Sequence, residues 1–414
     1  MKGVFVIIDG VADEPSDALG GKTPLEAAKT PNLDLIAKKS KIEHCYPIKE
    51  GVAPESSSAI VSLLGYDPSL APRGPLEAQG AGVKIRKGDL VLRTNFATID
   101  NLEDRNIMDS RAGRTLTTAE AKRLADVINK KVKLKYKFEF VPTIQHRGVL
   151  VIKGGFSDNI SNTDPRYGNG IVSSSGGEKM QFSRSLDDEE DSKLSADTLN
   201  KFIRDSFEVL NKHPINVSRA KKGLHSANVL LCRDAGGEPV SLKKEKGKWM
   251  ALGYMPLEIG IAQACGMDVY KFKYPDLRKN DVYSLLYFGL KKAIGNAIEM
   301  LKKNKDKYDY FYVHFKETDV PGHDGKAEEK VKMIELIDER FFSFLKNFVK
   351  DERIVVTADH TTSCKKKMHT ADSVPVMFFD SKVQGNGGRF TEADGRKGKK
   401  MLGNDLLGET LFRE

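Results

Sequence analysis

Apolar positions follow one pattern at the two ends of the chain and another in its middle. Near the N-terminus, the continuous apolar run Gly3–Ile8 predicts a strand that is buried on both faces. Towards the C-terminus, strand-like runs alternate with helical periodicity, and we expect strands at Tyr308–Phe315, Arg353–Thr357 and Val374–Phe379, with helices at Ser284–Lys302 and Glu328–Val349. This alternation predicts a parallel sheet with right-handed crossovers.

Two further helices are expected between the first strand and the middle of the chain. Thr30-Pro31-Asn32 is typical of a helix start, because proline is tolerated in the first turn, and this helix should run to about Ser40. A second helix should begin at Ser58–Leu64, where apolar residues have helical spacing after a Pro-Glu-Ser turn.

The middle of the chain has a mixed pattern. We expect helices at Thr117–Asn129 and Ala196–Asn211, strands at Lys133–Val141 and Gly148–Lys153, and a solvated loop at the acidic run Asp187–Asp191. The sequence therefore predicts an α/β fold in two domains. Residues 1–105 and 217–414 would form a mainly parallel sheet flanked by helices, and residues 106–216 a smaller inserted α+β domain.

Composition narrows the class of protein. With 414 residues the chain exceeds one simple core, and its net charge of +9 comes from scattered lysines and arginines. That scatter argues against nucleic-acid binding and suits an enzyme with small anionic substrates. The four cysteines form no CxxC pair, and no apolar run approaches the ~18 residues of a membrane span. We expect a cytoplasmic protein with reduced cysteines and no membrane contact.

Carboxylates and imidazoles follow the predicted strands. Asp9 ends the first strand, and the C-terminal part supplies the other candidates, namely Asp319, His323, Asp359, His360 and His369. In parallel sheets such strand ends meet at one edge and form active sites. These six ligands are enough for two adjacent divalent ions, and their mixed oxygen and nitrogen atoms suit Mn²⁺, Zn²⁺ or Co²⁺ better than Mg²⁺. Paired ions of this kind serve phosphoryl transfer.

A serine cluster and several cations could complete such a site. Ser56, Ser57 and Ser58 precede an apolar helix, where serine is either a simple N-cap or a nucleophile favoured by the helix dipole. Cationic and polar side chains in turn-like sequence of the middle region suggest a clamp for a doubly anionic substrate: Arg111, Arg114, His146, Arg147, Asp164 and Arg166. Lys316, three residues before Asp319, could neutralise further phosphate charge.

An ordered series of motifs resembles one known family. The series includes Asp9-Gly, Thr23-Pro-Leu-Glu-Ala-Ala28, Ser62-Leu-Leu-Gly-Tyr-Asp-Pro68, Arg73-Gly-Pro-Leu-Glu-Ala78, Asp109-Ser-Arg-Ala-Gly-Arg114, Asp319-Val-Pro-Gly-His-Asp324 and Thr357-Ala-Asp-His-Thr361. Along nearly its whole length the chain is similar to the archaeal-type cofactor-independent (2,3-bisphosphoglycerate-independent) phosphoglycerate mutases of the alkaline phosphatase superfamily. The resemblance implies interconversion of 3-phosphoglycerate and 2-phosphoglycerate in glycolysis and gluconeogenesis.

The resemblance also implies residue roles. Ser56 would be the nucleophile, and Asp9, Ser56, Asp359 and His360 would hold one metal ion. Asp319, His323 and His369 would hold the other. The two ions are expected to be Mn²⁺, with Zn²⁺, Co²⁺ or Mg²⁺ as alternatives. Substrate contacts would come from Arg111, Arg114, His146, Arg147, Asp164 and Arg166, with the phosphoserine shielded from water by domain closure.

The chain departs from the family around the proposed nucleophile. The family usually has Gly-Ser-Asp-Thr-Ala, whereas this chain has Glu55-Ser56-Ser57-Ser58-Ala59. Three consecutive serines leave Ser57 and Ser58 as rivals to Ser56. Two other functions are compatible with parts of the pattern: a phosphatase, phosphodiesterase or phosphonate hydrolase of the same superfamily, and a basic RNA-binding protein with a structural metal site.

Overall fold

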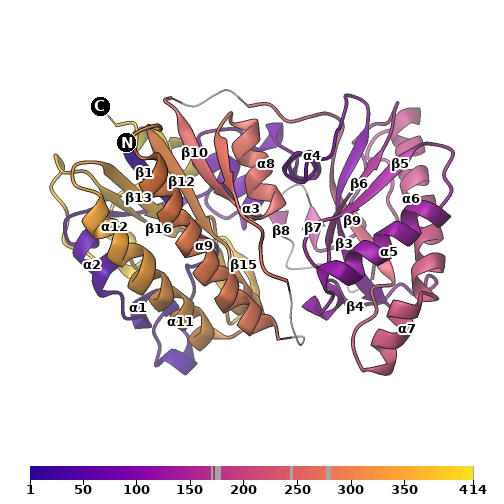
Figure 1. The fold of residues 1–414 in the computed structure, drawn as a ribbon, viewed down its shortest axis with the longest axis horizontal. Coiled ribbons are helices and arrows are strands. Elements are labelled where there is room, and N and C mark those ends of the chain that lie inside the picture. Colours follow the sequence, from indigo (N-terminus) through magenta and orange to yellow (C-terminus); the bar gives the residue numbers. More distant parts are fainter. Residues whose placement is uncertain (169–170, 173–178, 243–245, 277–280, 414) are drawn as a thin grey trace.

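Two large sheets organise the chain (Figure 1). The computed structural model describes residues 1–168, 171–172, 179–242, 246–276 and 281–413. The larger sheet has the strand order β11-β10-β12-β1-β13-β16-β2-β17. Its strands are β1 (Gly3–Ile8), β2 (Lys41–Tyr46), β10 (Trp249–Gly253), β11 (Asp268–Lys271), β12 (Tyr310–Phe315), β13 (Arg353–Thr357), β16 (Val374–Phe379) and β17 (Lys400–Leu402).

The predicted parallel direction is wrong for one strand of this sheet. β16 pairs antiparallel with both β13 and β2, while the other pairs of the sheet are parallel. The chain between β13 and β16 forms a small hairpin, β14 (Thr361–Ser363) and β15 (Met368–Thr370), and has no crossover helix. Because a parallel return requires such a crossover, the chain re-enters the sheet in the opposite direction.

Helices form a layer against this sheet. Their bounds are α1 (Pro24–Ala27), α2 (Pro31–Ala37), α9 (Val282–Asn304), α11 (Ala327–Ile337) and α12 (Ser343–Phe348). Figure 1 shows all five on one side, where α11 contacts α1 and α9, and α12 contacts α2. The single helix expected at Glu328–Val349 is continuous but contains a π-helical turn at Asp338–Phe342. Apolar residues of β1 and β12 are fully buried beneath this layer, which confirms the predicted α/β class.

The smaller sheet is antiparallel and has its own hydrophobic core. Its strand order is β4-β3-β6-β5, with β9 beside β3. The strands are β3 (Leu90–Ile99), β4 (Ile107–Asp109), β5 (Phe138–Pro142), β6 (Arg147–Ile152) and β9 (Val229–Gly236), and the helices are α5 (Thr118–Lys131), α6 (Glu190–Asn211) and α7 (Pro214–Lys221). The sheet thus takes in strands on both sides of the range 106–216.

Two boundaries in this region differ from the sequence prediction. Helix α6 begins at Glu190, six residues before the expected start, so the end of the acidic run lies in its first turn. Carboxylates are favoured there because the helix dipole is positive at the N-terminus. The first expected strand is shorter, since pairing starts only at Phe138.

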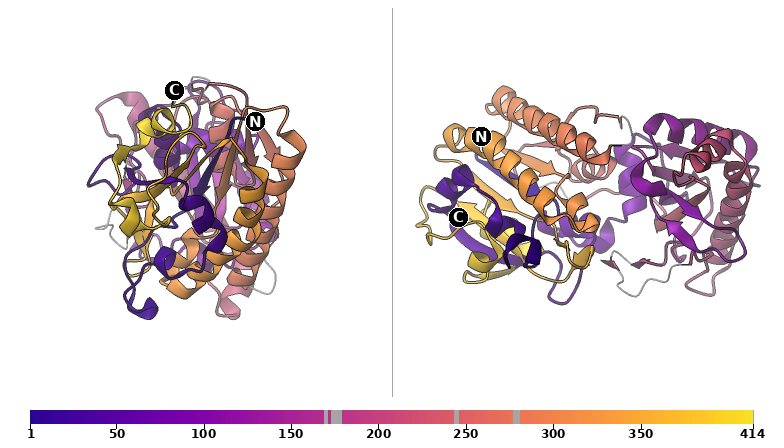
Figure 2. Two further views of the ribbon diagram at one scale, coloured as in Figure 1. Left: turned by 90° about the vertical axis from the view of Figure 1, so that its left-hand side faces the viewer. Right: turned by 90° about the horizontal axis from the view of Figure 1, so that it is seen from below.

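Helices α4 (Arg73–Gly80) and α8 (Pro256–Ala264) cross between the two sheets (Figures 1 and 2). Their backbones touch through two glycines: a Cβ on Gly80 would lie 1.7 Å from the carbonyl oxygen of Pro256, and one on Gly260 would lie 1.8 Å from that of Leu76. No larger side chain fits at this crossing. The two glycines therefore set how closely the larger unit, built on the eight-stranded sheet, approaches the smaller unit, built on the antiparallel sheet.

The remaining elements are short and lie near the site or the chain ends. They are α3 (Ser56–Leu63), α10 (Asp319–Asp324), α13 (Glu392–Gly395), α14 (Leu406–Glu409), β7 (Tyr167–Gly168) and β8 (Ile171–Val172). Throughout the described ranges, helices are too short or too polar to cross a membrane.

Candidate active site

Three adjacent strands of the larger sheet end at the same edge and carry the first site residues. β1 lies between β12 and β13 and is parallel to both. Asp9 follows β1 directly, Lys316 follows β12, and Asp359 lies two positions past β13. Their side chains therefore gather at the carboxyl edge, as the sequence predicted.

Asp9 is the buried centre of this group, with 1% of its surface exposed. Lys316 Nζ contacts Asp9 Oδ2 and lies 3.0 Å from Glu258 Oε1. His360 Nε2 lies 3.4 Å from Asp9 Oδ1. Burial and the charge of Asp359 raise the pKa of Asp9 well above its usual value, although Lys316 acts in the opposite direction. Carboxylates buried this close together favour a cation.

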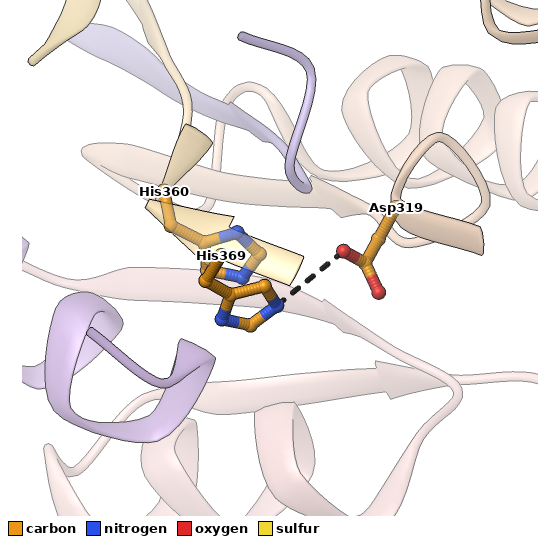
Figure 3. Close-up of side chains that lie close together, drawn as sticks. All are labelled: Asp319, His360 and His369. Atoms are coloured by element: carbon orange, nitrogen blue, oxygen red, sulfur yellow. Dashed lines mark ion pairs between the residues drawn. The ribbon is translucent and has the colours of Figure 1, made fainter. Parts of the chain in front are cut away.

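A second cluster comes from helix α10 and the β14–β15 hairpin. Asp319 lies 3.6 Å (Oδ1) from His369 Nε2 and 3.4 Å (Oδ2) from His323 Nε2. Figure 3 shows Asp319 facing His369, with the ring of His360 beside it. Thr362 donates a hydrogen bond to Asp319 Oδ1 at 2.8 Å and so orients this carboxylate from the hairpin.

The six ligands predicted from the sequence therefore lie together. Five of the six, together with the unpredicted His314, form two groups in which all ligand atoms lie within 4.8 Å of one another: Asp319, His360 and His369, and Asp9, His314 and Asp359. His323 is in neither group and contacts Asp319 instead. His360 is close to both groups, since its Nε2 is also 3.3 Å from Asp359 Oδ2. Asp9 Oδ1, Asp359 Oδ2 and His314 Nε2 are buried and have no hydrogen-bond partner among the described residues. Buried carboxylate and imidazole atoms that lack partners suit divalent metal ions.

The histidines of this cluster have different protonation preferences. Burial lowers the pKa of His323 to about 3 and that of His360 well below its usual value. Burial would also lower the pKa of His369, but the Asp319 carboxylate outweighs it and raises this pKa. Neutral imidazoles are the form that coordinates metal ions, so at least two of the three rings are suited to binding.

Ser56 is the first residue of α3 and points at the ligand cluster. Its Oγ lies 3.1 Å from His360 Nε2, and the helix N-terminus favours negative charge on that oxygen. Ser57 is 5% exposed and does not line the cavity described below. Ser58 Oγ donates to the backbone oxygen of Glu55 at 3.0 Å. Of the three rival serines, Ser56 therefore has the geometry of a nucleophile.

A cavity between the two sheets connects the ligand cluster with the predicted cations. Its wall includes eight predicted residues of both units besides Asp9 and Ser56, namely Arg111, Arg114, His146, Arg147, Lys316, Asp319, His323 and His369. Arg166 lines an adjoining groove, together with Arg111 and Arg114. Asp164 lines neither space, and its carboxylate pairs with Arg166 at 2.9 Å.

The cations in this wall are not equally available. Arg114 pairs with Asp324, whereas Arg111 and Arg147 make no ion pair with any residue that the structure describes. Burial lowers the pKa of Arg147, and it lowers that of His146 well below its usual value. Two unpaired guanidinium groups at a buried wall provide the donors that an anionic substrate requires.

Sequence reasoning missed several residues of the site. They are His314, Glu258 and Glu317 in the larger unit, Glu55, Arg73 and Glu77 around the nucleophile, and Arg93, Asn95, Tyr167 and Arg233 in the smaller unit. Two features of the sequence could have indicated some of these residues. Arg93 and Asn95 interrupt the apolar strand β3, and Arg73 precedes Glu77 by one helical turn.

Known proteins share both the sequence and the fold. Residues 37–216 match the family model of 2,3-bisphosphoglycerate-independent phosphoglycerate mutase, and residues 289–402 match that of the metalloenzyme superfamily. A protein with the former name from Aeropyrum pernix is 37% identical, over 99% of both chains. One from Methanopyrus kandleri is 38% identical, over 91% of this chain and 87% of the relative.

Solved structures agree with these matches. A protein of Pyrococcus horikoshii superimposes with a TM-score of 0.75 and 30% identity, over 99% of this chain and 96% of that one. The cofactor-independent phosphoglycerate mutase of Thermoplasma acidophilum superimposes with a TM-score of 0.58 and 27% identity, over 100% of this chain and 99% of that one. With this identity along nearly its whole length, the chain belongs to the 2,3-bisphosphoglycerate-independent phosphoglycerate mutase family of metalloenzymes.

Proposed function

We propose that this protein interconverts 3-phosphoglycerate and 2-phosphoglycerate through a phosphoserine at Ser56, without 2,3-bisphosphoglycerate. One observation carries the proposal: Ser56 Oγ lies 3.1 Å from His360 Nε2 and lines a cavity to which the larger unit contributes carboxylates and imidazoles and the smaller unit contributes arginines. The names of the archaeal relatives support the same reaction.

Two divalent ions complete the proposed site. Asp9, Ser56, Asp359 and His360 would hold one, and Asp319, His323 and His369 the other. We expect Mn²⁺ first, with Zn²⁺, Co²⁺ or Mg²⁺ as alternatives, because the ligands mix oxygen and nitrogen atoms. When bound, the ions make the serine hydroxyl more acidic and neutralise charge on the transferred phosphoryl group.

The residues of the chain carry out the transfer in two steps. Ser56 Oγ forms a bond to phosphorus while the bond from phosphorus to one glycerate oxygen breaks, and that oxygen takes up the proton that Ser56 loses. Arg111 and Arg147, the unpaired cations of the wall, would hold the glycerate by its carboxylate, with the neutral His146 beside them. The other glycerate hydroxyl then attacks phosphorus and returns its proton to Ser56. Arg114, Asp164, Arg166 and Lys316 would complete the substrate-binding set.

We further propose that the smaller sheet is the inserted substrate-binding domain. Its strands β3 to β9 run from Leu90 to Gly236 and have a separate hydrophobic core. This supports an insert wider than residues 106–216, with the phosphatase-like domain made from the two chain ends. The substrate would then bind between the domains, where the cavity lies.

A time course of ³¹P NMR spectra tests the reaction. The enzyme is loaded with Mn²⁺ and given 3-phosphoglycerate without bisphosphoglycerate, and the metal is removed from each sample before its spectrum is recorded. The 2-phosphoglycerate signal should grow to a constant ratio with wild-type protein and with Ser57→Ala, but not with Ser56→Ala. Accumulation of inorganic phosphate in its place would show a hydrolase and refute the proposal.

A further inference from the structure

The residue before the proposed nucleophile joins the two units of the molecule. Glu55 is the N-terminal flanking residue of α3, yet its side chain makes no capping hydrogen bond. Its Oε2 instead accepts hydrogen bonds from Arg73 Nη1 at 3.0 Å and Arg233 Nη1 at 2.6 Å. Arg73 belongs to α4, which packs against α8 and also against β3 and β9 of the smaller sheet, and Arg233 belongs to β9 itself.

Both partners of the Glu55–Arg233 pair are deeply buried. Glu55 is 1% exposed and Arg233 is 4% exposed. The guanidinium carbon of Arg233 lies 3.5 Å from the centre of the Tyr167 ring, and Tyr167 lines the cavity. Glu55 Oε1 and Arg233 Nε have no hydrogen-bond partner in the described structure. The pair is therefore a tight contact between the units at the edge of the cavity, directly beside Ser56.

A gain in folding stability is a poor explanation for a buried ion pair of this kind. Removing two charges from water costs several kcal/mol per ion, and apolar replacements of buried ion pairs are often neutral or stabilising. What the pair does provide is geometry, because a carboxylate that binds two guanidinium groups fixes the direction of both. In this chain that carboxylate is attached to the backbone of the turn that carries Ser56.

A second ion pair at the cavity also joins the two units. Arg114, at the end of a short turn in the smaller unit, pairs with Asp324 of α10, which follows the proposed metal ligand His323. Tyr283 donates a hydrogen bond to Asp324 at 2.9 Å. In both ion pairs, the residue of the larger unit therefore lies directly beside a proposed catalytic or metal-binding residue in the sequence.

We propose that Glu55 is a positioning residue that ties Arg233 of the smaller unit to the Ser56 turn and so keeps the units closed over the phosphoserine. The inference rests on the proposed function and deepens it. Isomerisation requires a glycerate hydroxyl to form the new bond to phosphorus while the bond to Ser56 Oγ breaks and the proton passes to Ser56. Water could attack in the same way and release inorganic phosphate. Closure at Glu55 excludes that water.

Two measurements on the metal-loaded, full-length enzyme test this role. Glu55→Gln removes the negative charge of the carboxylate while the side chain keeps nearly the same size and shape. We expect the ratio of inorganic phosphate to 2-phosphoglycerate formed to rise at least about tenfold. Amides of α3 and β9 should also exchange with solvent faster than in wild type. Lys153→Gln, which removes an ion pair with Asp89 within the smaller unit, should change neither quantity.

Arg233→Lys provides a second variant that keeps the charge but loses the planar fork. It should change the product ratio and the amide exchange in the same direction as Glu55→Gln, but by less. When Glu55→Gln is combined with Arg233→Gln, the change in each quantity should be smaller than the sum of the changes in the two single variants. Unchanged exchange in Glu55→Gln would overturn the coupling. Faster exchange with an unchanged product ratio would overturn the exclusion of water. A wild-type enzyme that forms no 2-phosphoglycerate would refute the proposed function, while the exchange data would still decide the coupling.

Discussion

The rings of His360 and His369 are stacked, with centroids 3.6 Å apart and 21° between their planes (Figure 3). His360 follows β13 closely and faces Asp9 and Asp359, whereas His369 lies on β15 and faces Asp319. Both rings belong with Asp319 to one ligand group, and His360 also reaches Asp9 and Asp359 of the other, so the stack links the two ligand groups. It brings them close enough to act on a single phosphoryl group.

This arrangement predicts how metal content responds to the loss of one ring. His369→Asn should lower the bound metal from about two ions per chain to about one, because Asp319 and His323 alone leave an incomplete ligand set. Metal content is measured by inductively coupled plasma mass spectrometry after gel filtration. His44→Asn, at a histidine that bonds Ser373 away from the site, should keep both ions. An unchanged content in His369→Asn would contradict the assignment.

Arg147 should be an important substrate contact. Its guanidinium is at the cavity wall and has no carboxylate partner among the described residues. A hydrogen bond to a charged group is worth about 1.5–3 kcal/mol, so Arg147→Gln should lower kcat/KM about 10- to 150-fold. A steady-state assay coupled to enolase measures this value. Arg184→Gln, at an exposed arginine of the same unit, serves as the control, and equal losses in both variants would exclude a specific contact.

Lys316 should stabilise the metal-free protein. It contacts Asp9 and lies 3.0 Å from Glu258, so Lys316→Met leaves two buried carboxylates without their cation. Removing one partner of a buried pair typically costs about 3–5 kcal/mol. We expect this loss in denaturant unfolding with a chelator present, and a smaller loss when Glu258→Gln is combined with it. Additive effects of the two changes would mean that Lys316 and Glu258 do not interact.

Much of the fold and most of the ligand set could be predicted because the relevant signals are local. β1, β13 and β16 match their predicted bounds, since each is a continuous apolar run. Asp9, Asp359 and His360 were found because they closely follow such runs, and Asp319, His323 and His369 because they form a short motif set just beyond them. His314 was missed because it lies inside the apolar run of β12, where a lone histidine gives no pattern.

Long-range pairing accounts for most of what could not be predicted. Glu55 and Arg233 are 178 positions apart in the chain, and only the crossing of the two units brings them together. In the sequence alone, Glu55 was notable only as a departure from the family pattern beside the proposed nucleophile. The antiparallel direction of β16 was missed because the alternation of strands and helices elsewhere suggested a crossover helix before it. The segment between β13 and β16 instead forms the short β14–β15 hairpin.

A buried carboxyl group away from the cavity predicts a pH dependence of stability. Glu392 is 3% exposed, accepts hydrogen bonds from Asp13 N and Thr23 Oγ1, and forms no ion pair with any residue that the structure describes. Burial raises its pKa from 4.5 to about 7, although these hydrogen bonds oppose the shift. The folded protein therefore binds this proton more tightly than the unfolded chain does. The stability from this group is fully present below about pH 4.5 and is lost as the pH rises through about 7.

Glu392→Gln should remove this dependence, because the amide cannot ionise and can still bond to Asp13 N and Thr23. Between pH 5 and 8 the free energy of unfolding of the variant, relative to wild type, should rise by up to about 3 kcal/mol. Urea unfolding with a chelator present measures the difference at each pH, and effects of other groups cancel because both proteins share them. Glu103→Gln, at an exposed position, should show a constant difference. A constant difference for Glu392→Gln as well would mean that Glu392 is already ionised in the folded protein at pH 5.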